Sequence, residues 1–207
     1  FNRGLRLKPD LVNAYNFIGI HYTQMQEFMQ AYDAFDSAID LAPDHEYAYL
    51  NRGIALYYGG RPELALDDFT NFHRQQKDDP YRVLWLYLAE YNVDREAADN
   101  ALKERVNNVH DNTWAKQVIK LYLGDISQGE FIHHLTDNVK SNKELTDRLC
   151  EAYFYLGKYN QLHGKPSVAA NFFKLALSTN VYEFVEHRYA KLELDLMRDA
   201  IKGRVEP

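Results

Sequence analysis

One predicted helix carries the residue types from which a metal site could be built. Glu130, His133, His134 and Asp137 lie close together, and the i,i+3 and i,i+4 spacings place Glu130, His133 and Asp137 on one face. Histidine and carboxylate groups are common zinc ligands, but a structural zinc site has four of them, and no second His or Cys cluster supplies the rest. Phe131, Ile132 and Leu135 give this helix an apolar side, which favours a simpler interpretation of the charged side as the solvated face of an amphipathic helix.

Two other positions could contribute to acid–base or nucleophilic chemistry. Glu186, His187 and Arg188 place an acid, a histidine and a base together, although catalysis would need a further group in a cleft. A buried hydrogen-bond network is the favoured interpretation. Cys150 could be a nucleophile beside a histidine, but its apolar neighbours favour a packing role.

The sequence contains no known motif for cofactor or phosphate binding. The glycines of Gly59-Gly60-Arg61-Pro62 are not followed by the Gly-Lys-Ser/Thr ending of a phosphate loop, so they predict a turn between helices. We therefore predict no catalytic, cofactor-binding or metal-binding residue, and no enzyme. A metal-dependent hydrolase built on Glu130, His133 and His134 is the alternative.

The elements that must position any site follow from a pattern of small and large apolar residues in residues 13–43. The marked positions are Tyr15, Ile18, Gly19, Tyr22, Ala31, Phe35, Ala38 and Pro43. The small residues allow two antiparallel helices to cross closely, and the proline ends the second helix. This pattern is typical of a tetratricopeptide (TPR) repeat.

The same pattern recurs along the chain with a step of 34 residues, from Gly19 to Gly53, and returns around Gly157. We predict an all-α fold: a TPR-type helical solenoid of antiparallel hairpins forming a right-handed superhelix, with a C-terminal capping helix. The expected single domain spans 1–207. Its parts are a half repeat at 1–9, TPRs at 12–45 and 46–79, divergent helical pairs at 81–140, a TPR-like repeat at 150–180 and a C-terminal helix at 181–201.

Composition agrees with a protein-binding array. The chain has 16 tyrosines and 11 phenylalanines, which TPR arrays use between helices. Its net charge is −6 with no basic block, so a nucleic-acid partner is not expected. Phe1 and Pro9 stand 34 residues before Phe35 and Pro43, so we expect the chain to open within an earlier repeat, after an amino-terminal piece that is absent.

The first helix of each repeat should line the inner groove of the array. Amides among aromatic rings suit an extended peptide, because amides bond its backbone while rings cover its side chains. The predicted protein- or peptide-binding residues are Asn13, Asn16, Phe17, Tyr47, Asn51, Tyr57, Tyr58, Tyr155 and Lys158. The alternative for the apolar ones is packing against neighbouring helices. Only Lys158 would suit a clamp for a C-terminal carboxylate, so such a clamp is not supported.

Three runs of sequence go beyond a generic TPR pattern: Ala48 to Arg61, Leu84 to Glu90, and Phe184 to Leu194. Together with Phe154 to Tyr159, they resemble the NlpI-type TPR lipoproteins of Gram-negative bacteria. The resemblance extends from Phe1 to Met197 and includes the divergent middle of the chain.

The resemblance implies an all-helical, homodimeric adaptor, lipid-anchored at the periplasmic face of the outer membrane. Such adaptors bring peptidoglycan endopeptidases to a tail-specific protease and so influence cell-wall turnover and division. The family's lipidated cysteine and dimer contacts belong to the part before Phe1, and Cys150 does not match that cysteine. A generic peptide-binding TPR module is the alternative.

Overall fold

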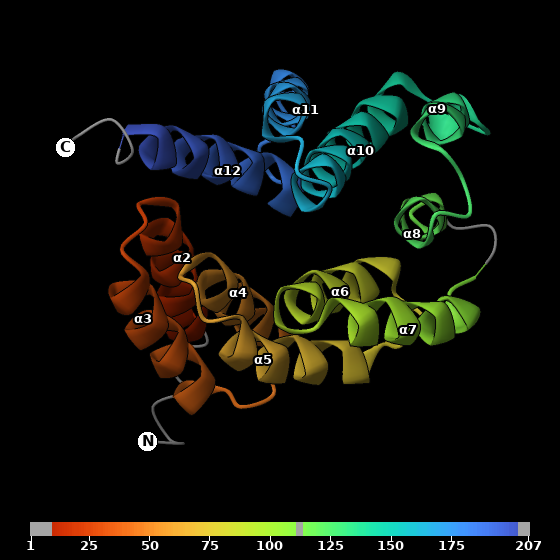
Figure 1. Cartoon of the computed structure of the whole chain (residues 1–207). Helices are drawn as coiled ribbons and strands as arrows, with labels where there is room; N and C mark the ends of the chain where they lie inside the picture. The colour runs from red at the N-terminus through yellow and green to blue at the C-terminus, as the bar shows by residue number, and fades with distance from the viewer. Residues whose placement is uncertain (1–9, 111–113, 203–207) are drawn as a thin grey trace. The chain divides into compact units, whose positions relative to one another are not determined.

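The structure is a computed structural model that describes residues 10–110 and 114–202. Every regular element in these residues is helical, and most successive helices pack against each other (Figure 1). This confirms the predicted all-α fold of TPR-type hairpins. The predicted half repeat at 1–9 lies outside the described residues.

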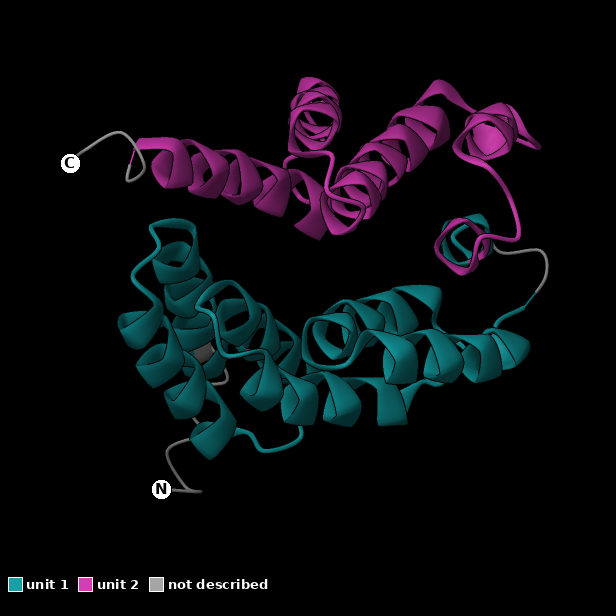
Figure 2. Cartoon of the chain, in the orientation of Figure 1, with its two compact units in different colours: residues 1–119 teal, residues 120–207 magenta. Residues whose placement is uncertain are grey.

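The chain divides into two compact units, residues 1–119 and 120–207 (Figure 2). The first unit contains three helical hairpins, formed by α2 with α3, α4 with α5 and α6 with α7. Their bounds are α2 Asp10–Gln24, α3 Phe28–Leu41, α4 Glu46–Tyr58, α5 Pro62–Gln75, α6 Pro80–Val93 and α7 Arg95–Arg105, followed by the 3₁₀ turn η1 Val106–Asn108.

The second unit is built on one long hairpin. Helix α8 (Lys116–Leu123) crosses the boundary between the units in sequence. The bounds of the others are α9 Gln128–His133, η2 His134–Thr136, α10 Asn142–Leu162, α11 Pro166–Ser178 and α12 Val185–Lys202. Helix α12 packs on α11 and α10, which confirms the predicted C-terminal helix that caps the last hairpin.

Small residues set the crossing within each hairpin. A Cβ atom added at Gly19 would lie 2.6 Å from Cε1 of Phe35, and one at Gly53 would lie 2.9 Å from Cε1 of Phe69. The rings therefore fill the space that the glycines leave, and Phe35 and Phe69 have no exposed surface. These contacts confirm the close crossing predicted from the repeat pattern.

Capping side chains fix several helix ends. Ser127 and Glu130 form a capping box, in which each side chain accepts from the other residue's backbone N–H. Asp79 accepts from the backbone N–H groups of Tyr81 and Arg82 at the start of α6.

Within the region predicted as divergent helical pairs at 81–140, two helices are short. Helix α8 begins at Lys116, after a turn in which the carbonyl oxygen of Trp114 accepts from the backbone N–H of Gln117. Helix α9 ends at His133 and is followed by the 3₁₀ turn η2 from His134.

Helix α10 begins at Asn142, before the predicted repeat at 150–180. Ser141 caps Glu144, whose carboxylate accepts from the backbone of Lys140. None of the described helices combines the length and apolar character needed to cross a bilayer.

Candidate protein-binding face

The first helices of unit 1 present two large aromatic side chains to solvent. Phe17 on α2 is 66% exposed, and Tyr47 on α4 is 53% exposed. Asn13 is also exposed, one turn before Phe17, and its side-chain oxygen lies 3.4 Å from Nε2 of His45. The Tyr47 ring also contacts the Phe72 ring, with centroids 6.0 Å apart. We define the exposed residues Asn13, Phe17 and Tyr47 of the two first helices as the aromatic face.

The two predicted groove asparagines bond to each other. Nδ2 of Asn51 on α4 donates to Oδ1 of Asn16 on α2 over 3.1 Å, and the two residues are 5% and 8% exposed. This pair joins neighbouring first helices and satisfies part of the hydrogen-bonding capacity of each amide. Their predicted role in ligand binding stays a prediction, whereas their role in joining α2 to α4 is established by the geometry.

Tyr57 and Tyr58 end α4 and are both partly buried. Their rings meet edge to face with centroids 5.1 Å apart, and Tyr57 also lies edge-on to Trp85, at 6.4 Å. The tyrosines therefore extend the aromatic packing toward α6, with part of each side chain in solvent.

The late-repeat positions, Tyr155 and Lys158, lie under α12. Tyr155 has no exposed surface, and its hydroxyl donates to Glu186 over 3.3 Å. Nζ of Lys158 donates to Oε1 of Glu193 over 2.5 Å, and both side chains are 3% exposed. The first-helix surface of this repeat is thus occupied by the chain's own helix.

The His133–His134 cluster does not assemble into a metal site in the described residues. Glu130 is engaged in its capping box, and Nδ1 of His134 lies 2.7 Å from Oδ2 of Asp137. Among residues 10–110 and 114–202, no three His, Cys, Asp or Glu side chains converge closely enough to hold a metal ion.

The other chemical candidates are engaged in packing. Nε2 of His187 lies 3.1 Å from the carbonyl oxygen of Leu177, and Glu186 accepts from Tyr155, which matches the predicted buried network. Burial raises the pKa of the Cys150 thiol to about 11 despite a hydrogen bond with Thr179. A thiol with that pKa is protonated near neutral pH, so it is a poor nucleophile.

A charge bridge that the repeat pattern does not predict joins three helices of unit 1. Arg52 on α4 makes two hydrogen bonds to Asp68 on α5, over 2.8 and 2.7 Å, and one to Asp36 on α3, over 2.6 Å. Asp68 is 2% exposed, and burial raises its pKa while Arg52 lowers it. The two short hydrogen bonds to a guanidinium favour the ionised carboxylate. No repeat signal marks these positions, because the pairs are 16 residues apart.

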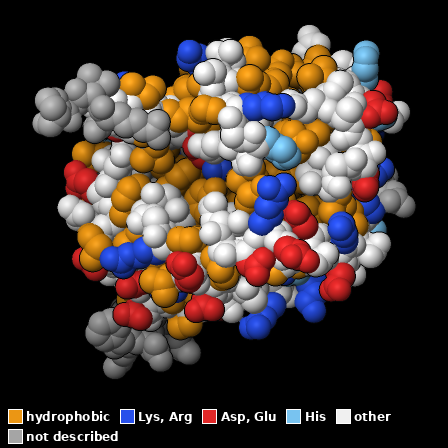
Figure 3. Space-filling view, in the orientation of Figure 1, with side chains coloured by type: hydrophobic (Ala, Val, Ile, Leu, Met, Phe, Trp, Pro, Cys, Tyr) orange, Lys and Arg blue, Asp and Glu red, His pale blue; other side chains and the backbone are white. Residues whose placement is uncertain are grey.

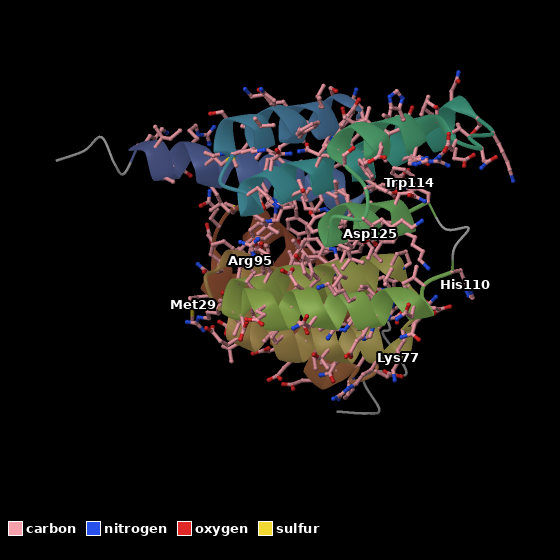
Figure 4. All side chains as sticks on the ribbon, turned by 45° about the vertical axis from the view of Figure 1, so that its right-hand side comes forward. Met29, Lys77, Arg95, His110, Trp114 and Asp125 are labelled. Carbon is pink, nitrogen blue, oxygen red and sulfur yellow. The ribbon has the colours of Figure 1, made fainter. Side chains whose placement is uncertain are left out.

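A pocket of about 280 Å³ opens beside this bridge, lined by Tyr32, Leu64 and Arg61 among others. The Arg61 guanidinium lies over the Tyr32 ring, 5.2 Å from its centroid, and Nη2 lies 3.7 Å from Sδ of Met29. Met29 is 58% exposed, at the edge of unit 1 labelled in Figure 4. Acidic and basic side chains are interspersed on the face seen in Figure 3.

A second missed pair explains the divergent hairpin. Arg105 takes a position where the repeat pattern expects an aromatic residue, and its guanidinium donates to both carboxylate oxygens of Glu90, over 2.5 and 2.6 Å. This bidentate pair joins α7 to α6 where ring packing would otherwise do so. The Glu90–Arg105 pairing could not be read from the repeat pattern, which concerns small and apolar residues.

Repeated antiparallel hairpins with glycine–aromatic crossings define a helical repeat protein of the TPR type. No known family model matches the sequence. Two crystal structures of MamA are similar in part. The first is 19% identical, with 86% of this chain and 98% of that chain covered and a TM-score of 0.45. The second is 21% identical, with 79% and 94% covered and a TM-score of 0.44.

Proposed function

We propose that the chain is a non-enzymatic adaptor that binds proteins through the aromatic face of α2 and α4. The observation that carries this proposal is the exposure of Phe17 and Tyr47, at 66% and 53%, on neighbouring first helices. Full burial of one such side chain contributes about 1.5–3 kcal/mol, so a partner that covers both gains substantial binding energy.

The chemistry of this face suits an extended segment of a partner protein. The rings of Phe17 and Tyr47 supply flat apolar surface, and the amide of Asn13 can both donate to and accept from a peptide backbone. An extended peptide needs such bonds along its length because its own backbone groups have no internal partners.

The more specific proposal rests on the resemblance to NlpI-type lipoproteins. In this proposal the protein is held by a lipid anchor at the periplasmic face of the outer membrane, as a homodimer. There it links peptidoglycan endopeptidases to a tail-specific protease, and so influences cell-wall turnover and division. The aromatic face would take one of these two partners.

A binding titration with a purified endopeptidase and a tail-specific protease tests the proposal. We expect Phe17→Ala combined with Tyr47→Ala to weaken one interaction about tenfold to a thousandfold, because roughly 1.5–4 kcal/mol of apolar burial is lost. The melting temperature should stay near that of the parent, since both side chains are largely exposed.

A matched control replaces two exposed apolar residues elsewhere. Val168→Ala with Leu175→Ala removes side chains that are 42% and 43% exposed on α11. The control should bind both partners like the parent. Equal binding by all three proteins would place the partner site off the aromatic face. Absence of binding by the parent to either enzyme would overturn the specific adaptor role.

A further inference from the structure

Helix α12 occupies the place that the first helix of another repeat would take. Glu186 and Glu193 follow Gly157 by 29 and 36 residues, and Ala48 and Ala55 of α4 follow Gly19 by the same 29 and 36 residues. Ala48 and Ala55 have no exposed surface, and Ala48 packs with Val12 and Ala38. At the same spacing from its glycine, α12 therefore carries two buried carboxylates in place of two methyl groups.

Both carboxylates meet polar partners on α10. Glu193 accepts from Nζ of Lys158 over 2.5 Å and from Nε2 of Gln161 over 2.8 Å. Glu186 accepts from the hydroxyl of Tyr155 over 3.3 Å. Lys158, Tyr155 and Gln161 are first-helix positions of the repeat, so α12 binds the surface that lines the groove in TPR arrays.

A buried ion pair between two helices contributes less to stability, and more to the choice of partner, than an apolar contact does. The loss of hydration of both charges offsets much of their attraction, so the pair adds little net stability over an apolar contact. Removing one partner is costly, however, because the other charge is left buried and uncompensated. The junction thus discriminates strongly between helices that carry a carboxylate at the position of Glu193 and helices that do not.

We propose that this α10 surface is a binding site for an acidic amphipathic helix of a partner protein, and that α12 occupies it until such a helix displaces it. The partner helix would carry a carboxylate at the position of Glu193, on the same face as a small residue at the position of Ala190. The inference rests on the proposed protein-binding role, and it names the chemistry of a partner for a surface made of residues other than Asn13, Phe17 and Tyr47.

The short connection between α11 and α12 determines how strongly α12 competes with a free helix for the α10 surface. Residues 179–184 alone join Ser178 to Val185, so α12 is held near its site at an effective concentration in the millimolar range. A free helix of the same affinity at micromolar concentration therefore cannot compete with an intact α12, so a displacing partner must bind the α10 surface more tightly than α12 does or be held beside it by another contact. Weakening the contact between Lys158 and Glu193 should lower the affinity of α12 enough for the binding of a free helix to be measured.

The experiment uses the full chain and a fluorescein-labelled peptide of residues 183–202. In the full-length variant Glu193→Gln, which we call chain Glu193→Gln, the carboxylate that pairs with Lys158 is removed. The affinity of α12 for the α10 surface should therefore be about a hundredfold or more lower than in the parent. We expect the peptide to bind this variant at micromolar concentration by fluorescence anisotropy, and to bind the parent at least tenfold more weakly. A peptide carrying Glu193→Gln should not bind the variant chain, and adding Lys158→Met to that chain should remove discrimination between the two peptides.

A matched control neutralises two exposed carboxylates. Chain Glu183→Gln with Asp199→Asn should behave like the parent, because Glu183 is exposed and Asp199 is 46% exposed. If chain Glu193→Gln is folded by circular dichroism and the peptide does not bind it, the proposal is overturned. Binding accompanied by a doubling of mass in light scattering would assign the site to exchange of α12 between two copies, and would also overturn it.

A second measurement covers the case in which chain Glu193→Gln does not fold. Unlabelled peptide in millimolar excess over the parent should accelerate hydrogen exchange at the amides of the chain's own α12 and leave those of α3 unchanged. Unchanged exchange in α12 would contradict displacement. Neither measurement involves the aromatic face, so either can fail while the Phe17 and Tyr47 variant still loses partner binding.

Discussion

At the crossing of α2 and α3, the ring of Phe35 fills the space that a side chain at Gly19 would need. A Cβ atom at Gly19 would stand 2.6 to 2.7 Å from three atoms of the Phe35 ring, which is itself fully buried. Gly157 and Phe173 repeat this relationship in the hairpin of α10 and α11. The fold therefore depends on glycine at these positions for space, since the backbone there is ordinary helix.

The first prediction follows from that space. Gly19→Leu should lower the free energy of unfolding by about 1–3 kcal/mol or more, because the new side chain forces Phe35 and its neighbours to move. Denaturant unfolding followed by circular dichroism measures the change. Gly129→Leu is the control, since a Cβ atom there meets nothing closer than 3.8 Å. Equal midpoints for the Gly19 variant and the parent would contradict the close crossing.

The second prediction concerns the amide pair between α2 and α4. Asn51→Ala should cost about 1–3 kcal/mol of stability, because Asn16 would keep a buried oxygen without its donor. The double variant Asn16→Ala with Asn51→Ala should cost less than the sum of the single variants. Additive losses in the cycle would show that the pair contributes nothing specific.

The third prediction is a pH dependence centred on Glu186. Burial raises the pKa of Glu186 above its ordinary value of 4.5, while the hydrogen bond from Tyr155 and the charge of Arg188 lower it. Cys150 also lies near enough for Glu186 to raise its pKa. Because the folded pKa exceeds the unfolded one, the native state binds the proton more tightly, so stability falls as pH rises through the folded pKa.

Glu186→Gln removes this dependence. Its amide oxygen can still accept from Tyr155, so the variant should be more stable than the parent at pH 7–8, with the difference shrinking toward pH 4.5. Thermal unfolding across this range provides the measurement, and Glu183→Gln is the exposed control. A parent that gains stability relative to Glu186→Gln with rising pH would reverse the sign and refute the argument.

The fourth prediction concerns zinc and the hydrolase alternative. His134 pairs with Asp137, and Glu130 closes a capping box, so isothermal titration should detect no stoichiometric zinc binding at micromolar concentration. His133→Ala is the comparison variant. A tight one-to-one event in the parent that this variant abolishes would revive a metal-dependent activity.

The sequence alone predicted the hairpins, because their determinants are local or repeat at a fixed step. Gly19 and Phe35 recur as Gly53 and Phe69. A small residue on one helix opposite an aromatic ring on the next indicates that the two helices cross closely. The capping box at Ser127 is likewise local, since its hydrogen bonds join residues three apart. These features need no knowledge of distant contacts.

The tertiary structure decided which polar residues face solvent. Lys158 and Asn51 occupy groove positions by repeat number, yet the first pairs with Glu193 35 residues away and the second with Asn16, also 35 residues away. Burial of a polar side chain depends on whether another helix supplies its partner, and the repeat pattern carries no such information. Of the predicted groove residues, Asn13, Phe17 and Tyr47 keep exposed side chains. Neighbouring helices bury four others: Asn16, Asn51, Tyr155 and Lys158.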